Sequence, residues 1–166
     1  QDRGRYMSAS VIIAEVNGQR NMSFHRQFLR DENHLVVRLV PRHLRTMVDQ
    51  ARERGEEVNI AIVNAPDPVV LLAEAMSFDE HIDELTVANT LHSKFYGRPL
   101  PVVQLENGIA VPANAEYAMC AEITLDDDLE APYVDITGTL DDERIEPVFQ
   151  IHSIHHRIDP IFHALI

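Results

Sequence analysis

The sequence predicts one α+β domain that is mainly β, and three observations support this prediction. The chain has 166 residues, which is the size of a single domain, and 45% of them are hydrophobic, enough to form a core. Apolar, β-branched runs of strand length recur and are separated by turn signals. Three stretches between residues 43 and 91 follow helical patterns instead. No repeat or linker divides the chain, so residues 1–166 are predicted to be one domain.

The first elements are predicted to be strands. Met7–Val16 is apolar and β-branched, and Asn17-Gly18 is typical of a tight hairpin turn. Asn21–Leu29 is then the returning strand, and His34–Val40 is a third strand after a polar turn. Three strands joined by short turns predict a meander.

The period changes to that of a helix after Pro41. Apolar residues fall at i, i+3, i+4 and i+7, which are Leu44, Met47, Val48 and Ala51. Gly55 stands where a helix C-cap is expected, and Val58–Val63 is typical of a buried strand. A second helix is predicted from Asp67 to Met76, and a third over Asp83–Leu91.

The second half returns to strand character. Strands are predicted over Val102–Leu105, Ala115–Leu125 and Pro147–Ile154, with a turn at Asn107-Gly108. Cys120 is the one cysteine, so it can form no internal disulfide; we expect it in the core and the protein in a reducing, cytoplasmic setting.

Charge excludes one class of partner. The net charge of −13 argues against nucleic-acid binding, which needs a basic surface. No apolar run approaches the ~20 residues of a membrane helix, so we expect no membrane span. A phosphate ligand would need local positive charge from arginines, a helix N-terminus or a cation.

Two acids stand close together in Leu129–Gly138. Glu130 and Asp135 flank Pro132, which has no backbone donor and favours a rigid loop. Such a loop can aim both carboxylates at one point, where each raises the pKa of the other, as general acid/base chemistry requires. The plain alternative is a solvated acidic turn.

Five short motifs in order carry a family resemblance: Arg20–Arg26, Val40–Leu44, Val102–Glu106 leading into Val111–Ala113, Leu129–Gly138 and Ile151–His163. Together they resemble the UbiD-like decarboxylases, which use prenylated FMN. The likeness covers nearly the whole chain. It implies a split β-barrel related to flavin reductases, with residues 1–166 as the central flavin-binding domain and the family's N-terminal and C-terminal domains absent.

The resemblance also implies a metal and a cofactor site. In the family, the residues that match Asn21, His43 and Glu106 hold a divalent ion that clamps the flavin phosphate. These donors suit Mn²⁺ or Mg²⁺, and K⁺ is a further candidate ion. Read alone, they are a turn residue, a residue of a helix's first turn and the end of a strand. The expected cofactor-binding residues are Asn21, Ser23, Phe24, His25, Arg26, His43 and Glu106.

The implied catalytic residues are Arg26, Glu130 and Asp135. Strand alternation places Arg26 on the same side as Met22 and Phe24, where an arginine needs an anionic partner; otherwise it is a surface residue. In the family the matching arginine networks with the two acids. The resemblance implies a carboxy-lyase for an aromatic or α,β-unsaturated acid: carbon dioxide leaves and Glu130 delivers a proton. Asp135 would share its protonation with Glu130.

Departures from the family pattern leave other functions open. Ala131 and Val134 stand where many members have glycine, which predicts a stiffer loop. The chain could be a cofactor-binding piece or one subunit of a split enzyme, in a homo-oligomer or with a partner subunit. One alternative is a flavin reductase or electron carrier on the same barrel. Another is a non-catalytic module in which tail histidines serve packing, namely His152, His155, His156 and His163.

Overall fold

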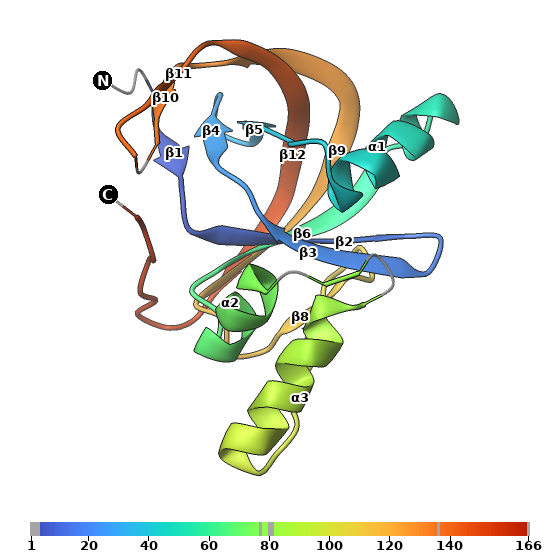
Figure 1. The fold of residues 1–166 in the computed structure, drawn as a ribbon, viewed down its shortest axis with the longest axis vertical. Helices are drawn as coiled ribbons and strands as arrows, with labels where there is room; N and C mark the ends of the chain where they lie inside the picture. The colour runs from blue at the N-terminus through green and yellow to red at the C-terminus, as the bar shows by residue number, and fades with distance from the viewer. Residues whose placement is uncertain (1–3, 77, 80–81, 136, 166) are drawn as a thin grey trace.

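The computed structural model describes residues 4–76, 78–79, 82–135 and 137–165. Its centre is an antiparallel eight-stranded sheet in the order β1-β4-β5-β12-β9-β6-β2-β3 (Figure 1). The strands of this sheet are β1 (Tyr6–Met7), β2 (Ser10–Val16), β3 (Gln19–Phe24), β4 (Gln27–Leu29), β5 (His34–Val37), β6 (Val58–Asn64), β9 (Tyr117–Glu130) and β12 (Arg144–His156). Two small ribbons pair β7 (Val102–Gln104) with β8 (Ala110–Pro112) and β10 (Tyr133–Val134) with β11 (Leu140–Asp141).

The longest pair of strands, β9 and β12, curves the sheet. Its register shifts between Pro147 and Phe149 and again between Ile151 and Ser153, and such bulges bend and twist a ladder. Figure 1 shows both strands arching over one side of the molecule. Over the described residues no ladder joins β3 to β1, so the curved sheet stays open along that seam. The mainly β fold with a few helices is confirmed.

Two hydrophobic clusters lie on opposite faces of the sheet. The first packs α1 (His43–Glu53) against the concave side, through the predicted residues Leu44, Met47, Val48 and Ala51. The second lies beneath α2 (Pro68–Ala75) and α3 (Glu84–Tyr96) and contains the buried, free Cys120. Asp67 and Asp83 cap these two helices by accepting hydrogen bonds from backbone N–H groups, as side chains do at helix starts.

The predicted meander is wrong. The stretch expected as one strand, Asn21–Leu29, is broken, because β3 ends at Phe24 and β4 begins at Gln27. β3 and β4 then lie toward opposite ends of the sheet order, and β5 pairs with β4 and β12. His25 and Arg26 therefore lie in the link where the chain crosses from one end of the sheet to the other.

Strand β9 runs further than the sequence predicts. It continues through the acidic residues Asp126, Asp127 and Asp128 and ends at Glu130, because β12 pairs with it along this length. The stretch predicted as a loop, Leu129–Gly138, thus begins inside a strand and continues into the β10–β11 ribbon; Ile136 lies outside the described residues. The end of β9 gives Glu130 a fixed backbone position.

Candidate functional site

Arg26 and Glu130 form a buried ion pair. Arg26 Nε donates to Glu130 Oε1 over 2.7 Å and Nη2 donates to Oε2 over 2.8 Å, which is the bidentate geometry of an arginine with a carboxylate. The Glu130 side chain is 0% exposed and that of Arg26 is 12% exposed. Burial opposes the charged guanidinium, but the hydrogen bonds to Glu130 and Asp141 outweigh burial and raise the pKa of Arg26. The structure therefore brings together two of the three predicted catalytic residues.

The second acid at Arg26 is Asp141 of β11. Its Oδ2 accepts from Arg26 Nη1 over 2.5 Å and also from Arg38 Nη1. Hydrogen bonding to Arg26 is the main reason that the pKa of Asp141 lies below its usual range. The ring of Tyr133 lies 4.8 Å from the Arg26 guanidinium, so the β10–β11 ribbon contacts Arg26 from both of its strands.

Asp135, the third predicted catalytic residue, is held within its own turn. Its Oδ1 accepts from the Thr137 hydroxyl over 2.6 Å and from the backbone N–H groups of Thr137 and Thr139. These bonds, the Thr137 hydroxyl first, keep its pKa below the usual value. Among the described residues no hydrogen bond links Asp135 to Glu130 or Arg26, although the charge of Arg26 contributes to its pKa.

A second polar cluster lines a cavity of about 480 Å³ between β3 and the starts of α1 and α3. Asn21 and His43 both line it, as does the acid Glu84 at the first position of α3. Glu84 Oε1 accepts from Asn21 Nδ2 over 3.4 Å, and Oε2 accepts from the Met22 backbone N–H over 3.1 Å. An amide, an imidazole and a carboxylate thus meet at one wall.

Positive charge compensates the acids of this cavity only in part. Burial is the main cause that raises the pKa of Glu84, which is 8% exposed, and that of Glu74. The negative charge of Glu84 further raises the pKa of Glu74, whereas Arg42 and His43 act in the opposite direction on one acid each. Arg42 is also the N-cap of α1, where no side chain of the described residues caps the helix. The backbone N–H groups at this end are available to an anion.

The other predicted cofactor residues lie along the same segment. Ser23, Phe24 and His25 line the cavity with Asn21, and Arg26 follows directly. Residues 21–26 therefore join the cavity to the Arg26–Glu130 pair. This part of the predicted site is contiguous in space because β3 ends here and the link to β4 turns away.

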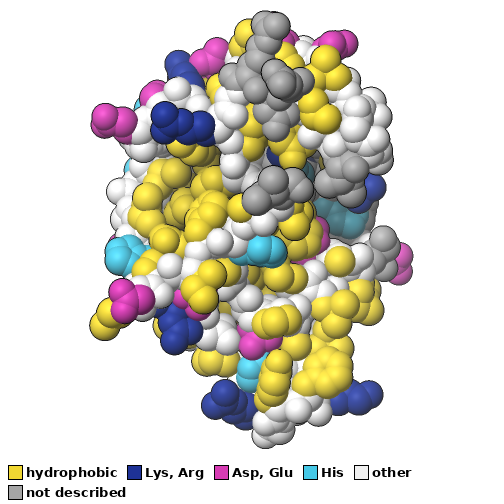
Figure 2. Space-filling model, turned by 90° about the vertical axis from the view of Figure 1, so that its left-hand side faces the viewer, with side chains coloured by type: hydrophobic (Ala, Val, Ile, Leu, Met, Phe, Trp, Pro, Cys, Tyr) yellow, Lys and Arg dark blue, Asp and Glu magenta, His cyan; other side chains and the backbone are white. Residues whose placement is uncertain are grey.

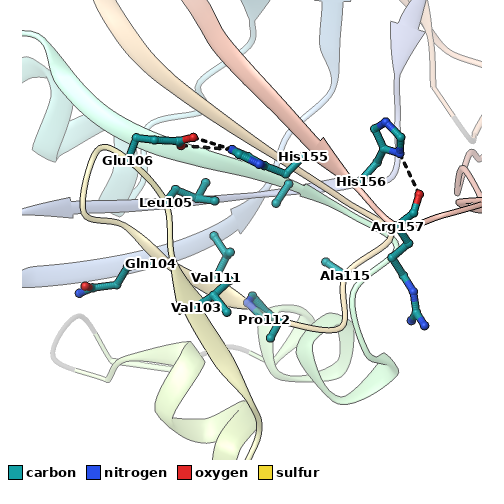
Figure 3. Close-up of a pocket in the computed structure, with 12 residues that line it drawn as sticks. Val103, Gln104, Leu105, Glu106, Val111, Pro112, Ala115, His155, His156 and Arg157 are labelled. Carbon is teal, nitrogen blue, oxygen red and sulfur yellow. Dashed lines mark hydrogen bonds and ion pairs between the residues drawn. The ribbon is translucent and has the colours of Figure 1, made fainter.

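Glu106 does not lie with Asn21 and His43. It lines a different cavity of about 430 Å³ beside the β7–β8 ribbon, where it faces His155 of β12 (Figure 3). Its Oε1 lies 2.9 Å from His155 Nε2, and its side chain is 60% exposed. A hydrogen bond from its own backbone and then His155 keep its pKa below the usual value. The three residues predicted to share a metal ion are thus divided between two cavities.

Sequence reasoning missed Glu84, Asp141 and Arg38. Glu84 directly follows the helix cap Asp83, so it looked like one of the acids that favour helix N-termini. Asp141 could not be found from sequence, because only the β10–β11 ribbon carries it back to Arg26.

Three further features concern metal clusters, membrane helices and the tail histidines. No group of three or more histidine, cysteine or acidic residues within the described parts of the chain is arranged to hold a metal ion. None of the described helices has the length and hydropathy to cross a bilayer. The tail histidines face acids or rings: His152 lies 3.3 Å from Glu122, and His156 contacts the ring of Tyr117.

Apolar side chains gather on the face shown in Figure 2, which is the side where Figure 1 places the C-terminal segment. That segment contributes exposed apolar residues, which are Ile158, Ile161, Phe162 and Leu165. Ile158 is 94% exposed. An exposed apolar patch of this kind is typical of surfaces that contact another protein element.

Comparison with known proteins gives a consistent result. A family model described as the UbiD 3-octaprenyl-4-hydroxybenzoate carboxy-lyase Rift-related domain matches residues 1–166. The chain is 39% identical over 169 residues to the anhydromevalonate phosphate decarboxylase of Methanothermobacter thermautotrophicus, and 36% identical over 168 residues to that of Methanocaldococcus jannaschii. Both alignments cover all of this chain, but they cover only 39% and 38% of the length of those relatives.

Solved structures show the same fold. The UbiD-class enzyme HmfF from Pelotomaculum thermopropionicum, in complex with FMN, superposes with a TM-score of 0.92 at 29% identity, over 98% of this chain and 37% of the enzyme. An FMN-binding protein from Thermus thermophilus superposes with a TM-score of 0.54 at 13% identity, over 94% of this chain and 75% of that protein, a likeness of fold alone. The chain thus spans between a third and two-fifths of the decarboxylases and UbiD-class enzymes that it resembles.

Proposed function

Because the chain belongs to the UbiD family of carboxy-lyases, we propose that it is the cofactor-binding part of a non-oxidative decarboxylase that uses prenylated FMN. The substrate class that we propose is a phosphorylated α,β-unsaturated acid of the anhydromevalonate phosphate type, because five of its relatives carry that activity in their names. The observation that carries the proposal is the buried Arg26–Glu130 pair beside a cavity suited to an anion and a cation.

The residues present fit the cofactor. The flavin phosphate would lie at the N-terminus of α1, near Arg42, where backbone N–H groups and a guanidinium favour an anion. A divalent cation, Mn²⁺ or Mg²⁺, would lie among Asn21, His43 and Glu84, because these three donors line one cavity and burial raises the pKa of Glu84 and of the neighbouring Glu74. We therefore propose Glu84, in place of Glu106, as the carboxylate ligand. When bound, the prenylated flavin supplies an electrophilic carbon that accepts the electrons of the broken carbon–carbon bond.

The protein's own groups would then place the substrate and move a proton. Arg26 orients the substrate carboxylate with the N–H groups that Glu130 and Asp141 leave over. Glu130 delivers the proton that replaces carbon dioxide. At rest both of its oxygens accept from Arg26 and its side chain is 0% exposed, so Glu130 has to take up a proton before it can deliver one. The ring of Tyr133 covers one face of Arg26 and restricts water there.

The remaining parts of such an enzyme would come from outside this chain. Relatives are more than twice as long, so we propose that further domains or a partner subunit close over the substrate. Assembly as an oligomer is consistent with the apolar face of Figure 2. It is also consistent with solved relatives described as a dimeric form and as a complex with a second subunit.

The test is the change Glu130→Gln in the decarboxylase that contains this chain. The amide oxygen accepts one of the two hydrogen bonds from Arg26, and Asp141 still pairs with Arg26, but the amide has no acidic proton to deliver. Carbon dioxide release should therefore stop while flavin binding stays. Loss of activity would be measured by carbon dioxide evolution, and flavin retention by absorbance after anaerobic loading. Full activity of this variant would remove the proton-donor role. Equal retention of ordinary FMN with electron-transfer activity, and no decarboxylation, would favour the flavin reductase alternative.

A further inference from the structure

A path of three close polar contacts leads from the backbone after β5 to Asn21. His25 Nδ1 lies 2.9 Å from the carbonyl oxygen of Arg38, and His25 Nε2 lies 3.0 Å from Ser23 Oγ. Ser23 Oγ in turn lies 3.3 Å from Asn21 Oδ1. All the side chains along this path line the cavity in which we place the cation.

The positions of the protons on this path follow from its chemistry. A carbonyl oxygen only accepts, so Nδ1 of His25 carries the hydrogen that reaches Arg38. The packing around the ring lowers the pKa of His25 to about 4; the Arg38 hydrogen bond opposes this shift and the charge of Arg42 adds to it. The ring is therefore neutral near pH 7 and its Nε2 carries a lone pair. Ser23 donates its hydroxyl hydrogen to that lone pair.

The direction of the Ser23 hydroxyl determines the hydrogen bonding of the Asn21 side-chain oxygen. A serine hydroxyl has one hydrogen, so Ser23 cannot donate to His25 and to Asn21 Oδ1 at the same time. The amide nitrogen of Asn21 donates to Glu84, which leaves Oδ1 facing a serine lone pair. Asn21 is 6% exposed, and among the described residues its oxygen then has no hydrogen-bond donor. A buried acceptor in this state is satisfied by a donor or by a cation, and an amide oxygen is a ligand that Mn²⁺ and Mg²⁺ accept.

We propose that His25 is a positioning residue for the cation: it holds the Ser23 hydroxyl turned away, so that the Asn21 oxygen stays available to a divalent ion. His25 does not touch the ion itself. The proposal rests on the proposed function only in placing a cation beside Asn21. It explains why a histidine occupies the link between β3 and Arg26, where its ring spans Arg38 and Ser23.

The test is a double-mutant cycle read by Mn²⁺ affinity, with Mn²⁺ alone titrated into the protein and free ion followed by electron paramagnetic resonance. His25→Phe keeps a ring but removes the acceptor, so Ser23 turns its hydrogen to Asn21. Mn²⁺ affinity should then fall about tenfold, the scale of outer-shell effects at metal sites. Ser23→Ala alone should change affinity little. Adding Ser23→Ala to His25→Phe should restore it, because the competing hydrogen is gone.

His34→Phe is the matched control, since His34 pairs with Asp31 outside the cavity and its loss should leave Mn²⁺ affinity unchanged. Wild-type affinity in His25→Phe, or no rescue by Ser23→Ala, would overturn the proposal, because a purely structural histidine gives no such rescue. Nitrogen NMR of the unmodified protein decides independently of any variant. A hydrogen on Nδ1 and none on Nε2 supports the proposal, and the opposite tautomer overturns it. Absence of Mn²⁺ binding in the unmodified protein would instead refute the cation site of the proposed function.

Discussion

The two ends of the segment from Asn21 to Arg26 differ in whether their charged side chains are paired. At the Arg26 end each charge has a partner: Glu130 and Asp141 face Arg26, and Asp141 also faces Arg38. At the Asn21 end the acid Glu84 is buried with a raised pKa and accepts only from neutral N–H groups among the described residues. We call the first the complete end, because its charges are paired within the chain, and the second the open end, because Glu84 has no charged hydrogen-bond donor among the described residues. In the function proposed above, a cation would complete the open end and the Arg26–Glu130 pair would lie beside the cofactor.

The largest effect should come from breaking the complete end. Arg26→Met removes the partner of a fully buried carboxylate and should lower the free energy of unfolding by about 3–5 kcal/mol, the usual cost of an unpaired buried charge. Urea unfolding measures the change. The double variant with Glu130→Leu should regain most of the loss. If Arg26→Met alone were as stable as the unmodified protein, Arg26 would not be needed to compensate a buried charge on Glu130.

The acids at the open end should make the folding stability of the metal-free protein depend on pH. Glu84 and Glu74 have folded-state pKa values above the ordinary 4.5, so between 4.5 and those raised values the folded protein binds more protons than the unfolded chain. The contribution of these two acids to stability without a cation should therefore fall as pH rises through this window. His25 acts in the opposite direction, because its pKa is lowered from 6.5 to about 4 and its contribution rises with pH between those values. Asp135 and Asp141 have lowered pKa values and act below 3.8, outside it.

Two controls separate Glu84 from the other buried acids. Relative to the unmodified protein, Glu84→Gln should shift the slope of stability against pH upward, because the neutral amide removes one of the raised carboxyl groups; Glu146 also has a raised pKa and is unchanged in this variant. Saturating Mn²⁺ should shift the slope of the unmodified protein in the same direction, since the ion binds the ionised acid. Thermal unfolding at a series of pH values measures both. The same slope with and without Mn²⁺ would count against an open, cation-binding end.

The smallest effect should come from Glu106→Gln. Glu106 is exposed and faces His155 in the other cavity, so its charge should not matter to Mn²⁺ bound beside Asn21. Calorimetric titration with Mn²⁺ should give the affinity of the unmodified protein. A large loss of affinity would restore Glu106 to the ligand set.

Much of this arrangement could be predicted from the sequence, and the failures have physical causes. Local patterns located the helices, and the mainly β class followed from the short apolar runs. Arg26 has the acidic partner that was expected, but the strand alternation used to argue for it is wrong, because β3 ends at Phe24 and that residue is 39% exposed. The identity of the second partner was not predictable: Asp135 and Asp141 lie six residues apart, and the pairing of β10 with β11 decides which reaches Arg26.

Glu84 and Glu106 show the same limit at the other end. Both acids stand at the edge of a secondary-structure element, and nothing local distinguishes them. The packing of α3 beside β3 brings Glu84 to Asn21, while the β7–β8 ribbon carries Glu106 to β12. Contacts between residues 60 or more positions apart decide which acid shares a cavity with Asn21. Long-range contacts also decide where β3 ends and β4 begins, because these two strands pair with different neighbours in the sheet.

The most direct test of the whole account is anomalous X-ray diffraction at the manganese edge from crystals loaded with FMN and Mn²⁺. We expect one strong peak among Asn21, His43 and Glu84, with the flavin phosphate beside it at the start of α1 and the isoalloxazine ring on the side of Arg26. A peak at Glu106 and His155, or a flavin on a face away from the Arg26–Glu130 pair, would contradict it.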